Sequence, residues 1–314
     1  MDKLRYGIIS TSSIAPRFIA AVRESNSGDI IAISSRTEDK AKQKANEWNI
    51  PKYYGDYSSL LKDEDINIVY ISSVNSMHYP MAKEALEHGK HVVCEKPCTT
   101  SYSHTKELFE LAEKKGLFFM EAQKMLLLPC INEVSEYIMR GDLGEVSMVE
   151  LSHSFPGSYN DWMYNKELGG GPLLSSGIYA IQFILKLFGS IDRISIEKSS
   201  QPNGVEWQYI ITGSTKGGVL FSIKNSTKSI LDNTARIFGS CGYIEIPEYW
   251  KAKKIVYHLS DKTPFIKEYP YKYEMVYEAE HIKNCIEKGM NVSDIVDKDI
   301  TLEGIRCLER IMDV

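Results

Sequence analysis

The sequence predicts an α/β fold, in which a doubly wound parallel sheet is followed by a C-terminal α+β domain with an open, mainly antiparallel sheet. Over the first third of the chain, short β-branched runs alternate with segments of helical period. Near residue 122 this alternation stops, and strand-length runs separated by turn residues become frequent. Repeated β–α–β units are typical of a parallel sheet, and successive strands joined by turns are typical of an antiparallel one.

The first domain, predicted over residues 1–122, is defined by hydrophobic period and by helix-end signals. A strand over residues 4–10 leads into a helix over 14–24, whose apolar residues recur at helical spacing. Residues 66–72 are apolar almost throughout, as expected of a parallel strand buried on both faces. The other expected elements are strands over 30–34, 91–94 and 117–121, and helices over 38–48, 80–88 and 103–115.

The second domain is predicted over residues 123–314. A helix over 131–140, a strand over 146–155 and a helix over 172–187 come first. Residues 191–266 then contain strand-length runs separated by turn signals such as Lys216-Gly217-Gly218, which predicts an antiparallel meander. Two helices, over 274–288 and 301–312, are expected to close the domain.

Composition restricts the class of protein. A length of 314 residues predicts about two domains, and the net charge of −5 is scattered without a basic stripe, so we expect no nucleic-acid partner. The apolar stretch near the N-terminus is too short for a membrane span, and we expect a cytoplasmic protein without a membrane partner. Six cysteines without a Cys-x-x-Cys pair are expected to be reduced thiols: Cys94, Cys98, Cys130, Cys241, Cys285 and Cys307.

A serine-rich turn joins the first predicted strand to the first helix, where dinucleotide-binding folds hold a pyrophosphate. Serines replace both leading glycines of the usual Gly-x-Gly-x-x-Gly/Ala pattern, and only the final small residue is kept. Hydroxyl groups there are able to donate hydrogen bonds to phosphate oxygens. In the alternative, Ser12 or Ser13 simply caps the helix. The predicted phosphate contacts are Ser10, Thr11, Ser12, Ser13 and Ile14.

The second predicted strand ends in Ser35 and Arg36, with no acidic residue at its tip. An Asp or Glu there would hold the ribose hydroxyls of NAD, whereas a guanidinium pairs with a phosphate through a fork of donors. The pair therefore favours NADP(H), with NAD(H) as the alternative cofactor. In the opposing interpretation, Arg36 is a solvated loop charge.

The tripeptide Glu95-Lys96-Pro97 follows a predicted strand directly, at the edge where ligands of open α/β sheets bind. A lysine held beside a positively charged nicotinamide loses basicity, so Lys96 suits proton transfer near neutral pH. A tripeptide is weak evidence alone. This one gains weight because it lies one strand beyond residues 75–78 and two strands beyond residues 35–36.

Together these motifs resemble the Gfo/Idh/MocA family of oxidoreductases, and the chain looks most similar to its branch of dimeric dihydrodiol dehydrogenase-like and NADP-dependent xylose dehydrogenase-like proteins. The resemblance covers nearly the whole chain. It rests on residues 7–18, Ser35-Arg36, Asn75-Ser76-Met77-His78, Glu95-Lys96-Pro97, Met120-Glu121-Ala122, Pro129, Gly141-Asp142-Leu143-Gly144, and Leu168-Gly169-Gly170-Gly171-Pro172-Leu173-Leu174 through Gly177-Ile178-Tyr179.

The resemblance implies a Rossmann domain that holds NAD(P) and hydride exchange with a sugar, polyol or diol. It makes Lys96 catalytic and places Tyr179 against the substrate, whereas the alternative for Tyr179 is a core tyrosine. We expect further substrate contacts from Gln123 and Trp162, although Trp162 equally suits a core or interface position. Further cofactor contacts are expected from Ser73, Asn75, His78 and Glu95.

Two histidines have structural alternatives. His78 is equally typical of a helix-starting histidine that hydrogen-bonds locally. His153 lies in a predicted strand of the second domain, where we expect a core or interface residue. Since no histidine stands at zinc-ligand spacing from a cysteine, we expect no metal site.

Two departures from the family pattern concern the substrate site. Ser175 stands where the family has an aspartate four residues before the tyrosine, and Leu126 stands where the branch has an arginine. These changes motivate an alternative function, a non-catalytic NADP-binding regulatory protein of the same fold. A third alternative is reduction of an unsaturated ring, in which Lys96 would serve equally.

The family's second domain commonly makes the subunit interface through its open sheet. An uncovered sheet face would expose apolar surface that a partner subunit buries. We therefore expect a homodimer or higher homo-oligomer that acts on a small-molecule substrate.

Overall fold

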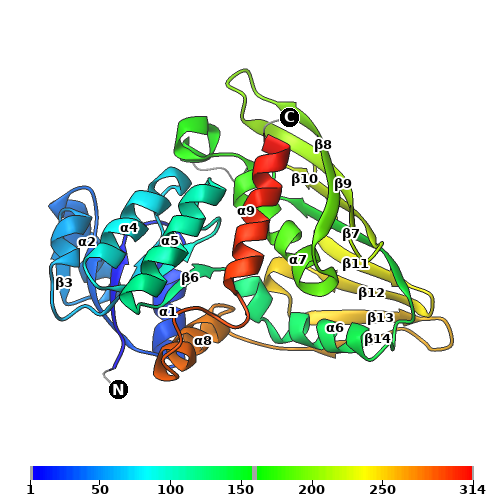
Figure 1. Cartoon of the computed structure of the whole chain (residues 1–314), viewed down its shortest axis with the longest axis horizontal. Helices are drawn as coiled ribbons and strands as arrows, with labels where there is room; N and C mark the ends of the chain where they lie inside the picture. Colours follow the sequence, from blue (N-terminus) through cyan, green and yellow to red (C-terminus); the bar gives the residue numbers. More distant parts are fainter. Residues whose placement is uncertain (1–2, 158–160, 313–314) are drawn as a thin grey trace. The chain divides into compact units, whose positions relative to one another are not determined.

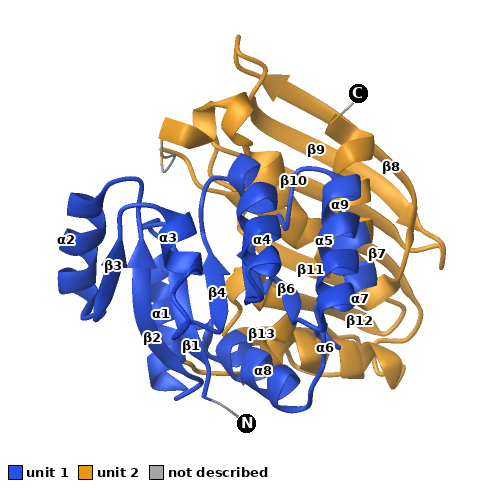
Figure 2. Ribbon diagram, turned by 60° about the vertical axis from the view of Figure 1, so that its left-hand side comes forward, with its two compact units in different colours: residues 1–123, 273–302 blue, residues 124–272, 303–314 orange. Residues whose placement is uncertain are grey.

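The structure is a computed structural model that describes residues 3–157 and 161–312. The chain forms two compact units, coloured blue and orange in Figure 2, which comprise Met1–Gln123 with Tyr273–Leu302 and Lys124–Lys272 with Glu303–Val314. Residues 273–302 are a correction, because the sequence analysis placed them in the second domain. Helix α8 (Val276–Glu287) packs on α1 (Ala15–Glu24) in the first unit, and hydrophobic period cannot tell which sheet a helix will cover.

A parallel sheet forms the centre of the first unit, with strand order β3-β2-β1-β4-β5-β6. The order runs outward in both directions from β1 and β4. Because parallel crossovers are right-handed and the strand order reverses between the halves, the helices within one half cover the opposite face from the helices within the other. Figure 1 shows these helices and the sheet that they cover. This is the predicted doubly wound arrangement. Its strands are β1 (Arg5–Ile9), β2 (Asp29–Ser34), β3 (Lys52–Tyr54), β4 (Ile68–Ile71), β5 (His91–Glu95) and β6 (Phe119–Ala122).

The helices of this unit lie close to their predicted ranges. The helix expected to begin at Pro80 starts two residues earlier, at His78. The short elements β3 and α3 were not predicted, because three and five residues are too few to show a hydrophobic period. Besides α1 and α8, the helices are α2 (Glu38–Trp48), α3 (Tyr57–Leu61), α4 (His78–Glu87) and α5 (Tyr102–Lys115), with the 3₁₀ turn η1 (Asn75–Met77).

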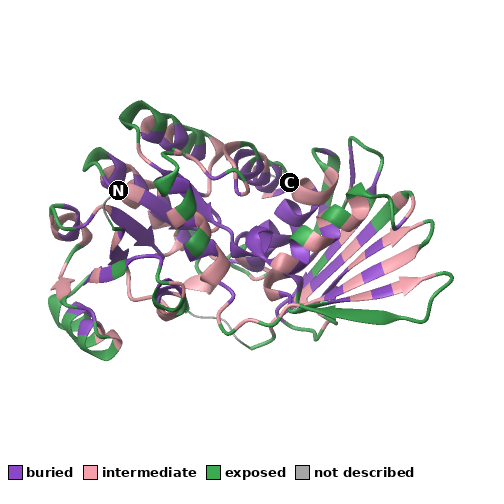
Figure 3. Cartoon of the chain, turned by 90° about the horizontal axis from the view of Figure 1, so that it is seen from below, coloured by how far each residue is buried: buried purple, intermediate pink, exposed green. Residues whose placement is uncertain are grey.

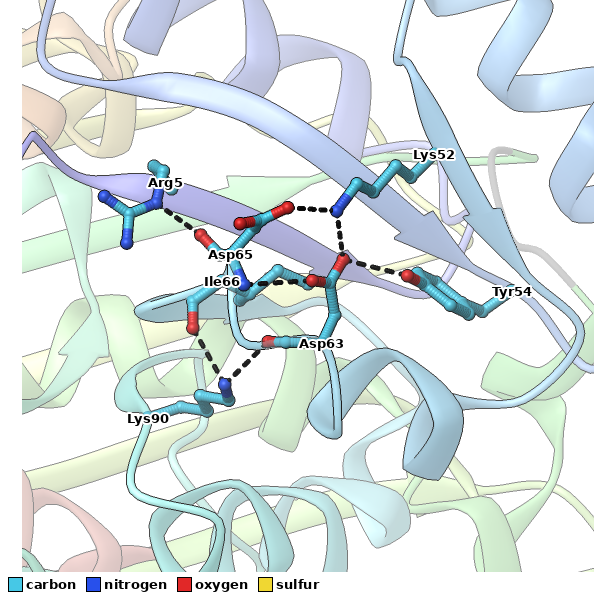
Figure 4. Close-up of polar contacts among 7 residues, drawn as sticks. All are labelled: Arg5, Lys52, Tyr54, Asp63, Asp65, Ile66 and Lys90. Atoms are coloured by element: carbon cyan, nitrogen blue, oxygen red, sulfur yellow. Dashed lines mark hydrogen bonds and ion pairs between the residues drawn. The ribbon is translucent and has the colours of Figure 1, made fainter.

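At the amino end of the parallel strands, charged side chains pair with one another and with backbone carbonyls (Figure 4). Lys52 Nζ donates to Asp63 Oδ2 at 2.8 Å and to Asp65 Oδ2 at 2.6 Å, and Tyr54 Oη donates to Asp63 Oδ2 at 2.8 Å. The Lys90 ammonium donates to the carbonyl oxygens of Asp63 and Ile66, both at 2.8 Å. These bonds tie β3 and the start of β5 to the turn before β4.

The second unit contains a larger sheet in the order β14-β13-β12-β11-β7-β10-β9-β8. Its neighbours are antiparallel with one exception among the described strands, because β10 pairs parallel with β7. The predicted meander is corrected at this point, since the early strand β7 inserts between β11 and β10. The strands are β7 (Val146–Ser154), β8 (Ile191–Ser200), β9 (Glu206–Thr215), β10 (Leu220–Ser226), β11 (Thr234–Gly239), β12 (Gly242–Pro247), β13 (Lys254–Leu259) and β14 (Phe265–Glu268).

Buried and exposed residues alternate along these strands (Figure 3). Residues 166–188 are long and apolar enough to cross a membrane by length and composition, but 83% of their most apolar 18-residue stretch is buried inside the structure, as in a core helix. The helices of the unit are α6 (Pro129–Met139) and α7 (Ile178–Phe188), and α9 (Lys298–Met312) ends in it; short helical turns are η2 (Lys124–Leu127), η3 (Asp161–Tyr164), η4 (Lys166–Leu168), η5 (Leu173–Gly177) and η6 (Tyr249–Lys251).

Several apolar side chains on the strands of this sheet are exposed to solvent. Met148 is 43% exposed, and Ile210 and Leu220 are each 50% exposed. A hollow of about 740 Å³ lies over these strands, lined by Met148 and Leu220 together with Arg193 and Arg310. This unit therefore presents apolar surface bordered by arginine.

Candidate active site

The turn after β1 has a backbone that glycine would adopt more easily than serine. Ser10 has φ +92°, in the left-handed region, and its N–H donates to the Ser34 carbonyl oxygen at 3.2 Å. Ser10, which stands where the usual pattern has its first glycine, thus keeps a backbone conformation typical of glycine. A backbone of this kind brings successive N–H groups to one side of the turn.

The first turn of α1 has no side-chain cap. Its N-cap residue is Ile14, and Ser12 Oγ donates to Ser72 Oγ at 2.9 Å instead of capping the helix, so the capping alternative is wrong. Within the described residues, the N–H groups of Thr11, Ser12, Ser13 and Ile14 donate to no protein acceptor. Four unpaired donors at a helix N-terminus fit the phosphate groups of a dinucleotide.

Ser35 and Arg36 follow β2, directly beside this turn in the sheet order. Ser35 is half-buried, and its N–H donates to the Tyr54 carbonyl oxygen at 3.1 Å. Arg36 is exposed. Arg36 thus stands at the carboxyl end of β2, on the strand next to β1.

His78 is buried at the start of α4, after β4. Its Nδ1 lies 2.8 Å from the Pro97 carbonyl oxygen and its Nε2 lies 3.1 Å from the Ser73 carbonyl oxygen. Burial lowers the pKa of His78, so the ring is neutral at neutral pH and donates its single N–H to one of these carbonyls. The local hydrogen bonds expected in the structural alternative are therefore present. Asn75 is buried in η1, on the same strand exit.

Lys96 follows β5, and the Lys96–Pro97 peptide bond is cis. The Lys96 N–H donates to Glu95 Oε2 at 3.2 Å, while Tyr70 Oη donates to Glu95 Oε1. Burial lowers the pKa of Lys96; the negative charges of Glu95 and Glu121 oppose this effect without cancelling it, and Arg17 adds to it. An ammonium with a lowered pKa exchanges protons more readily near neutral pH than an ordinary lysine does.

All predicted cofactor residues of the first unit therefore lie at the carboxyl ends of neighbouring strands. Gln123, which is fully buried, follows β6 on the same edge. The amide N–H of Cys98 donates to the buried carboxylate of Glu121 at 2.8 Å, which fixes the chain just after the Lys96 turn.

In the second unit, three consecutive glycines allow close backbone approach before Tyr179. A Cβ on Gly170 would lie 2.5 Å from the Met163 carbonyl oxygen, and one on Gly171, where φ is +112°, would lie 2.6 Å from Glu206 Oε1. Glu206 accepts the N–H of Leu173 at 2.7 Å, and the chain then makes the π-helical turn η5 before α7. The sequence predicted a single helix over residues 172–187, and the structure corrects this, because the first turn is π-helical. Such π-helical turns are frequent at functional sites.

Tyr179 is 5% exposed in α7, and its hydroxyl accepts a hydrogen bond from Lys124 Nζ at 3.0 Å. Lys124 is itself 5% exposed, in η2. The sequence analysis missed Lys124. The available signal is weak: Lys124 is a charged residue directly before the apolar run Met-Leu-Leu-Leu at residues 125–128.

The remaining predicted residues of this unit are placed as follows. Trp162 is half-buried in η3, and Ser175 lies in η5, one turn before Tyr179. Leu126 is fully buried in η2. His153 is half-buried in β7 and stacks on Trp250, with ring centres 3.8 Å apart, as expected of a structural histidine.

Comparison with protein families matches both parts of the chain. Residues 4–123 match the oxidoreductase family with an NAD-binding Rossmann fold, and residues 131–245 match the Gfo/Idh/MocA C-terminal domain. Curated relatives include trans-1,2-dihydrobenzene-1,2-diol dehydrogenases. The mouse (Mus musculus) protein is 30% identical over 303 residues, which cover 93% of this chain and 91% of the relative. The Xenopus laevis protein is 30% identical over 323 residues, covering 98% and 96%.

Solved structures share the fold over nearly the whole chain. A 3-ketoreductase from Actinomadura kijaniata, in complex with NADP and TDP-benzene, has a TM-score of 0.91 and 22% identity, covering 99% of this chain and 97% of its own. An aldose-aldose oxidoreductase from Caulobacter crescentus, complexed with glycerol, has a TM-score of 0.89 and 25% identity, covering 98% and 96%.

Proposed function

Because this chain belongs to the Gfo/Idh/MocA family of oxidoreductases, we propose that it is an NADP-preferring dehydrogenase or reductase acting on a secondary alcohol or its carbonyl in a small diol, polyol or sugar. The observation that carries the proposal is Lys96, a lysine of lowered pKa at the carboxyl edge of a dinucleotide-type sheet. When bound, the nicotinamide supplies the hydride chemistry. The protein supplies orientation and proton transfer.

The N–H groups of Thr11, Ser12, Ser13 and Ile14 would hold the pyrophosphate at the N-terminus of α1. Ser10 would keep the backbone of the turn in its left-handed conformation. Contacts on the nicotinamide side would come from the strand exits that carry Ser73, Asn75, His78 and Glu95. The neutral ring of His78 lies between the carbonyl oxygens of Ser73 and Pro97 and donates its single N–H to one of them.

NADP preference rests on the tip of β2. Arg36 is exposed there and Ser35 is beside it, so a guanidinium and a hydroxyl are available to a 2′-phosphate. The tripeptide Ser35-Arg36-Thr37 contains no carboxylate that would accept hydrogen bonds from the ribose hydroxyls of NAD. We therefore expect NADP(H) to bind more tightly than NAD(H), which remains the weaker cofactor.

Lys96 would take the proton of the reacting hydroxyl in the oxidation direction and return it in reduction, at its Nζ atom. Tyr179 would donate its hydroxyl hydrogen bond to the reacting oxygen. Gln123 and Trp162 would line the substrate region. Since the relatives at 30% identity are dihydrobenzene-diol dehydrogenases, a small cyclic trans-diol is the first substrate class to test, ahead of aldoses.

We place the protein in the cytoplasm as a homodimer or higher homo-oligomer. All six cysteines are free thiols, which fits a reducing compartment. The open sheet face exposes Met148, Ile210 and Leu220, and burial of such a patch against a second copy would remove apolar surface from water. Sedimentation at several concentrations tests this assembly, and a concentration-independent monomer would refute it.

The first experiment is a fluorescence titration of the purified protein with NADPH and then NADH, followed by a turnover screen of trans-diols, polyols and sugars with NADP⁺. The proposal expects tighter NADPH binding and turnover of at least one of these compounds. Failure to bind either nucleotide would reject the enzyme. Tight NADPH binding without any turnover would favour the non-catalytic regulator that Ser175 and Leu126 motivate.

A further inference from the structure

We propose that Lys124 is a positioning residue for Tyr179, which directs the tyrosine hydroxyl toward the reacting oxygen and favours its loss of a proton. This inference rests on the role proposed above for Tyr179. It concerns a residue directly before the apolar run that precedes Pro129, and no family motif quoted above contains it.

The contact is held by packed elements of one unit. The short turn η2 supplies Lys124 and packs against α7, which supplies Tyr179. Both side chains are 5% exposed, and the Lys124 ammonium donates to Tyr179 Oη at 3.0 Å while standing 5.3 Å from the centre of the tyrosine ring. A charge-assisted hydrogen bond removed from water in this way is stronger than one at the surface.

The donor inventory of the pair fixes the direction of the bond. An ammonium has three donors and no acceptor, whereas a phenol has one donor and two lone pairs. Tyr179 Oη must therefore accept from Lys124, and the tyrosine's own proton points elsewhere. This is the arrangement that a group donating to a substrate oxygen requires.

Besides setting the direction of the hydrogen bond, the positive charge of Lys124 affects the ionisation of Tyr179. A cation against the phenol oxygen stabilises the phenolate more than the phenol, and a low-dielectric setting strengthens the effect. Leu126 is buried and apolar where the branch has an arginine, so Lys124, two residues earlier, supplies a positive charge to the same short segment. We infer that this chain applies the charge to Tyr179.

The test follows ionisation of Tyr179 directly. Tyrosine labelled with ¹³C at Cζ is incorporated, and the Tyr179 resonance is assigned by its loss in Tyr179→Phe. Titration with base compares wild type with Lys124→Met, which removes donor and charge, Lys124→Gln, which keeps an N–H donor, and Lys124→Arg, which keeps both. Lys254→Met, at the exposed start of β13, is the matched control for loss of a lysine charge.

We expect the Tyr179 resonance to titrate about one pH unit higher in Lys124→Met and Lys124→Gln than in wild type, Lys124→Arg and Lys254→Met. With a substrate in hand, kcat should fall roughly 10- to 100-fold in Lys124→Met with KM changed far less, and Lys124→Arg should restore most of it.

Titration of Tyr179 at the same pH in wild type and Lys124→Met would overturn the proposal. If Lys124→Met does not fold, Lys124→Gln against Lys124→Arg makes the same decision. The spectroscopic result judges Lys124 even if no substrate is turned over, so failure of the proposed function is distinguished from failure of this inference.

A separate cluster in the first unit points to a binding site for a divalent cation of the zinc type. The expectation of no metal overlooked that His281 stands four residues before Cys285, a spacing that places both on one helix face. His281 and Cys285 lie one turn apart on α8, and Asp294 lies in the segment after it. Their donor atoms all lie within 4.8 Å of one another. Imidazole, thiolate and carboxylate are the ligand set that Zn²⁺ prefers, and three protein ligands leave a fourth position for water.

His281 Nε2 is the centre of the cluster. Ser293 Oγ lies 2.7 Å from it, Cys285 Sγ lies 3.3 Å from it and Asp294 Oδ1 lies 3.7 Å from it. One imidazole nitrogen cannot satisfy three polar groups equally, whereas a cation among them binds nitrogen, sulfur and oxygen together. Binding would release the Cys285 thiol proton to solvent, and the exposed Asp294 gives the ion a route of entry.

Cobalt is the probe for this site. Co²⁺ is added to the reduced protein, and the thiolate-to-metal absorption in the near ultraviolet is followed, with Zn²⁺ affinity measured against a coloured chelator. We expect the band in wild type and in Cys241→Ser, which removes the exposed cysteine, and its loss in Cys285→Ser. Asp294→Asn should weaken Zn²⁺ binding roughly 10-fold. An unchanged Co²⁺ spectrum in Cys285→Ser, or equal Zn²⁺ affinity in wild type and His281→Asn, would overturn the site.

Discussion

The two ends of the parallel sheet use their polar groups in opposite ways. At the amino end, Lys52, Asp63 and Lys90 are bonded to one another's elements through side chains and carbonyls. At the carboxyl end, the N–H groups of the turn from Thr11 to Ile14 donate to no protein acceptor among the described residues. The same strands thus finish in a closed polar network on one side and in unused donors on the other.

This difference separates stability from binding. Groups that satisfy one another lower the free energy of the folded chain and offer little to a ligand. Groups left unpaired at a helix N-terminus have a cost in the free protein that an anion removes. Substitutions at the amino end should therefore change unfolding, and substitutions at the carboxyl end should change binding and turnover.

The largest expected effect is at Lys96. Lys96→Met removes the group that exchanges the substrate proton and should lower kcat about 1,000-fold, while NADPH binding stays within a fewfold of wild type. Steady-state kinetics and the fluorescence titration measure the two quantities. The matched control is Lys52→Met at the opposite end, which should lower the urea midpoint and leave kcat unchanged. Normal turnover in Lys96→Met would remove Lys96 from the mechanism.

Arg36, at the same carboxyl edge, is expected to set the preference between the two cofactors. Arg36→Ala should weaken NADPH binding about 10- to 100-fold and leave NADH binding almost unchanged, because only the phosphorylated cofactor loses a charge-assisted contact. Arg23→Ala is the control, since the Arg23 guanidinium already donates to the carbonyls of Trp48 and Asn49. A parallel loss of NADPH and NADH affinity in Arg36→Ala would contradict the role in 2′-phosphate binding.

Asp63 tests the amino end through pH. Burial on its own would raise the pKa of Asp63, but hydrogen bonds from Lys52, the Asp65 N–H and Tyr54 lower it overall. The stabilisation by the carboxylate is therefore complete above the unfolded-state pKa of about 4 and is lost as pH falls through the lower folded-state value.

Asp63→Asn should consequently lower the free energy of unfolding by about 1–2 kcal/mol at pH 7. The gap to wild type should shrink in increasingly acid buffers. Urea denaturation at several pH values measures it, and Asp65→Asn, whose side chain is 69% exposed, should show a smaller effect. A gap that is independent of pH would mean that the Asp63 charge contributes nothing.

The smallest effect is expected at Ser10. Ser10→Gly removes a Cβ from a residue with φ +92° and should stabilise the fold by about 1 kcal/mol. It should leave NADPH affinity equal or slightly higher. Ser13→Gly, at an exposed position of the same turn without positive φ, should destabilise the chain slightly. Thermal melting distinguishes the two, and a destabilised Ser10→Gly would show that the serine hydroxyl outweighs the backbone strain.

The parallel sheet and the strand exits that carry Ser10, Arg36 and Lys96 could be predicted from local sequence signals. Hydrophobic period and helix-end residues are local signals, and the carboxyl ends of neighbouring parallel strands always meet at one edge. The motifs quoted for the family resemblance likewise lie in continuous stretches of chain. Such features are readable without knowing how distant segments pack.

Features that depend on contacts between distant segments could not be predicted from the sequence. Three such features join residues far apart in the chain. They are the return of residues 273–302 to the first unit, the parallel pairing of β10 with β7, and the hydrogen bond from Lys124 to Tyr179. Period identifies an apolar face but not the surface that will cover it. Lys124 likewise precedes an apolar run, but only packing buries it and selects Tyr179 as its partner.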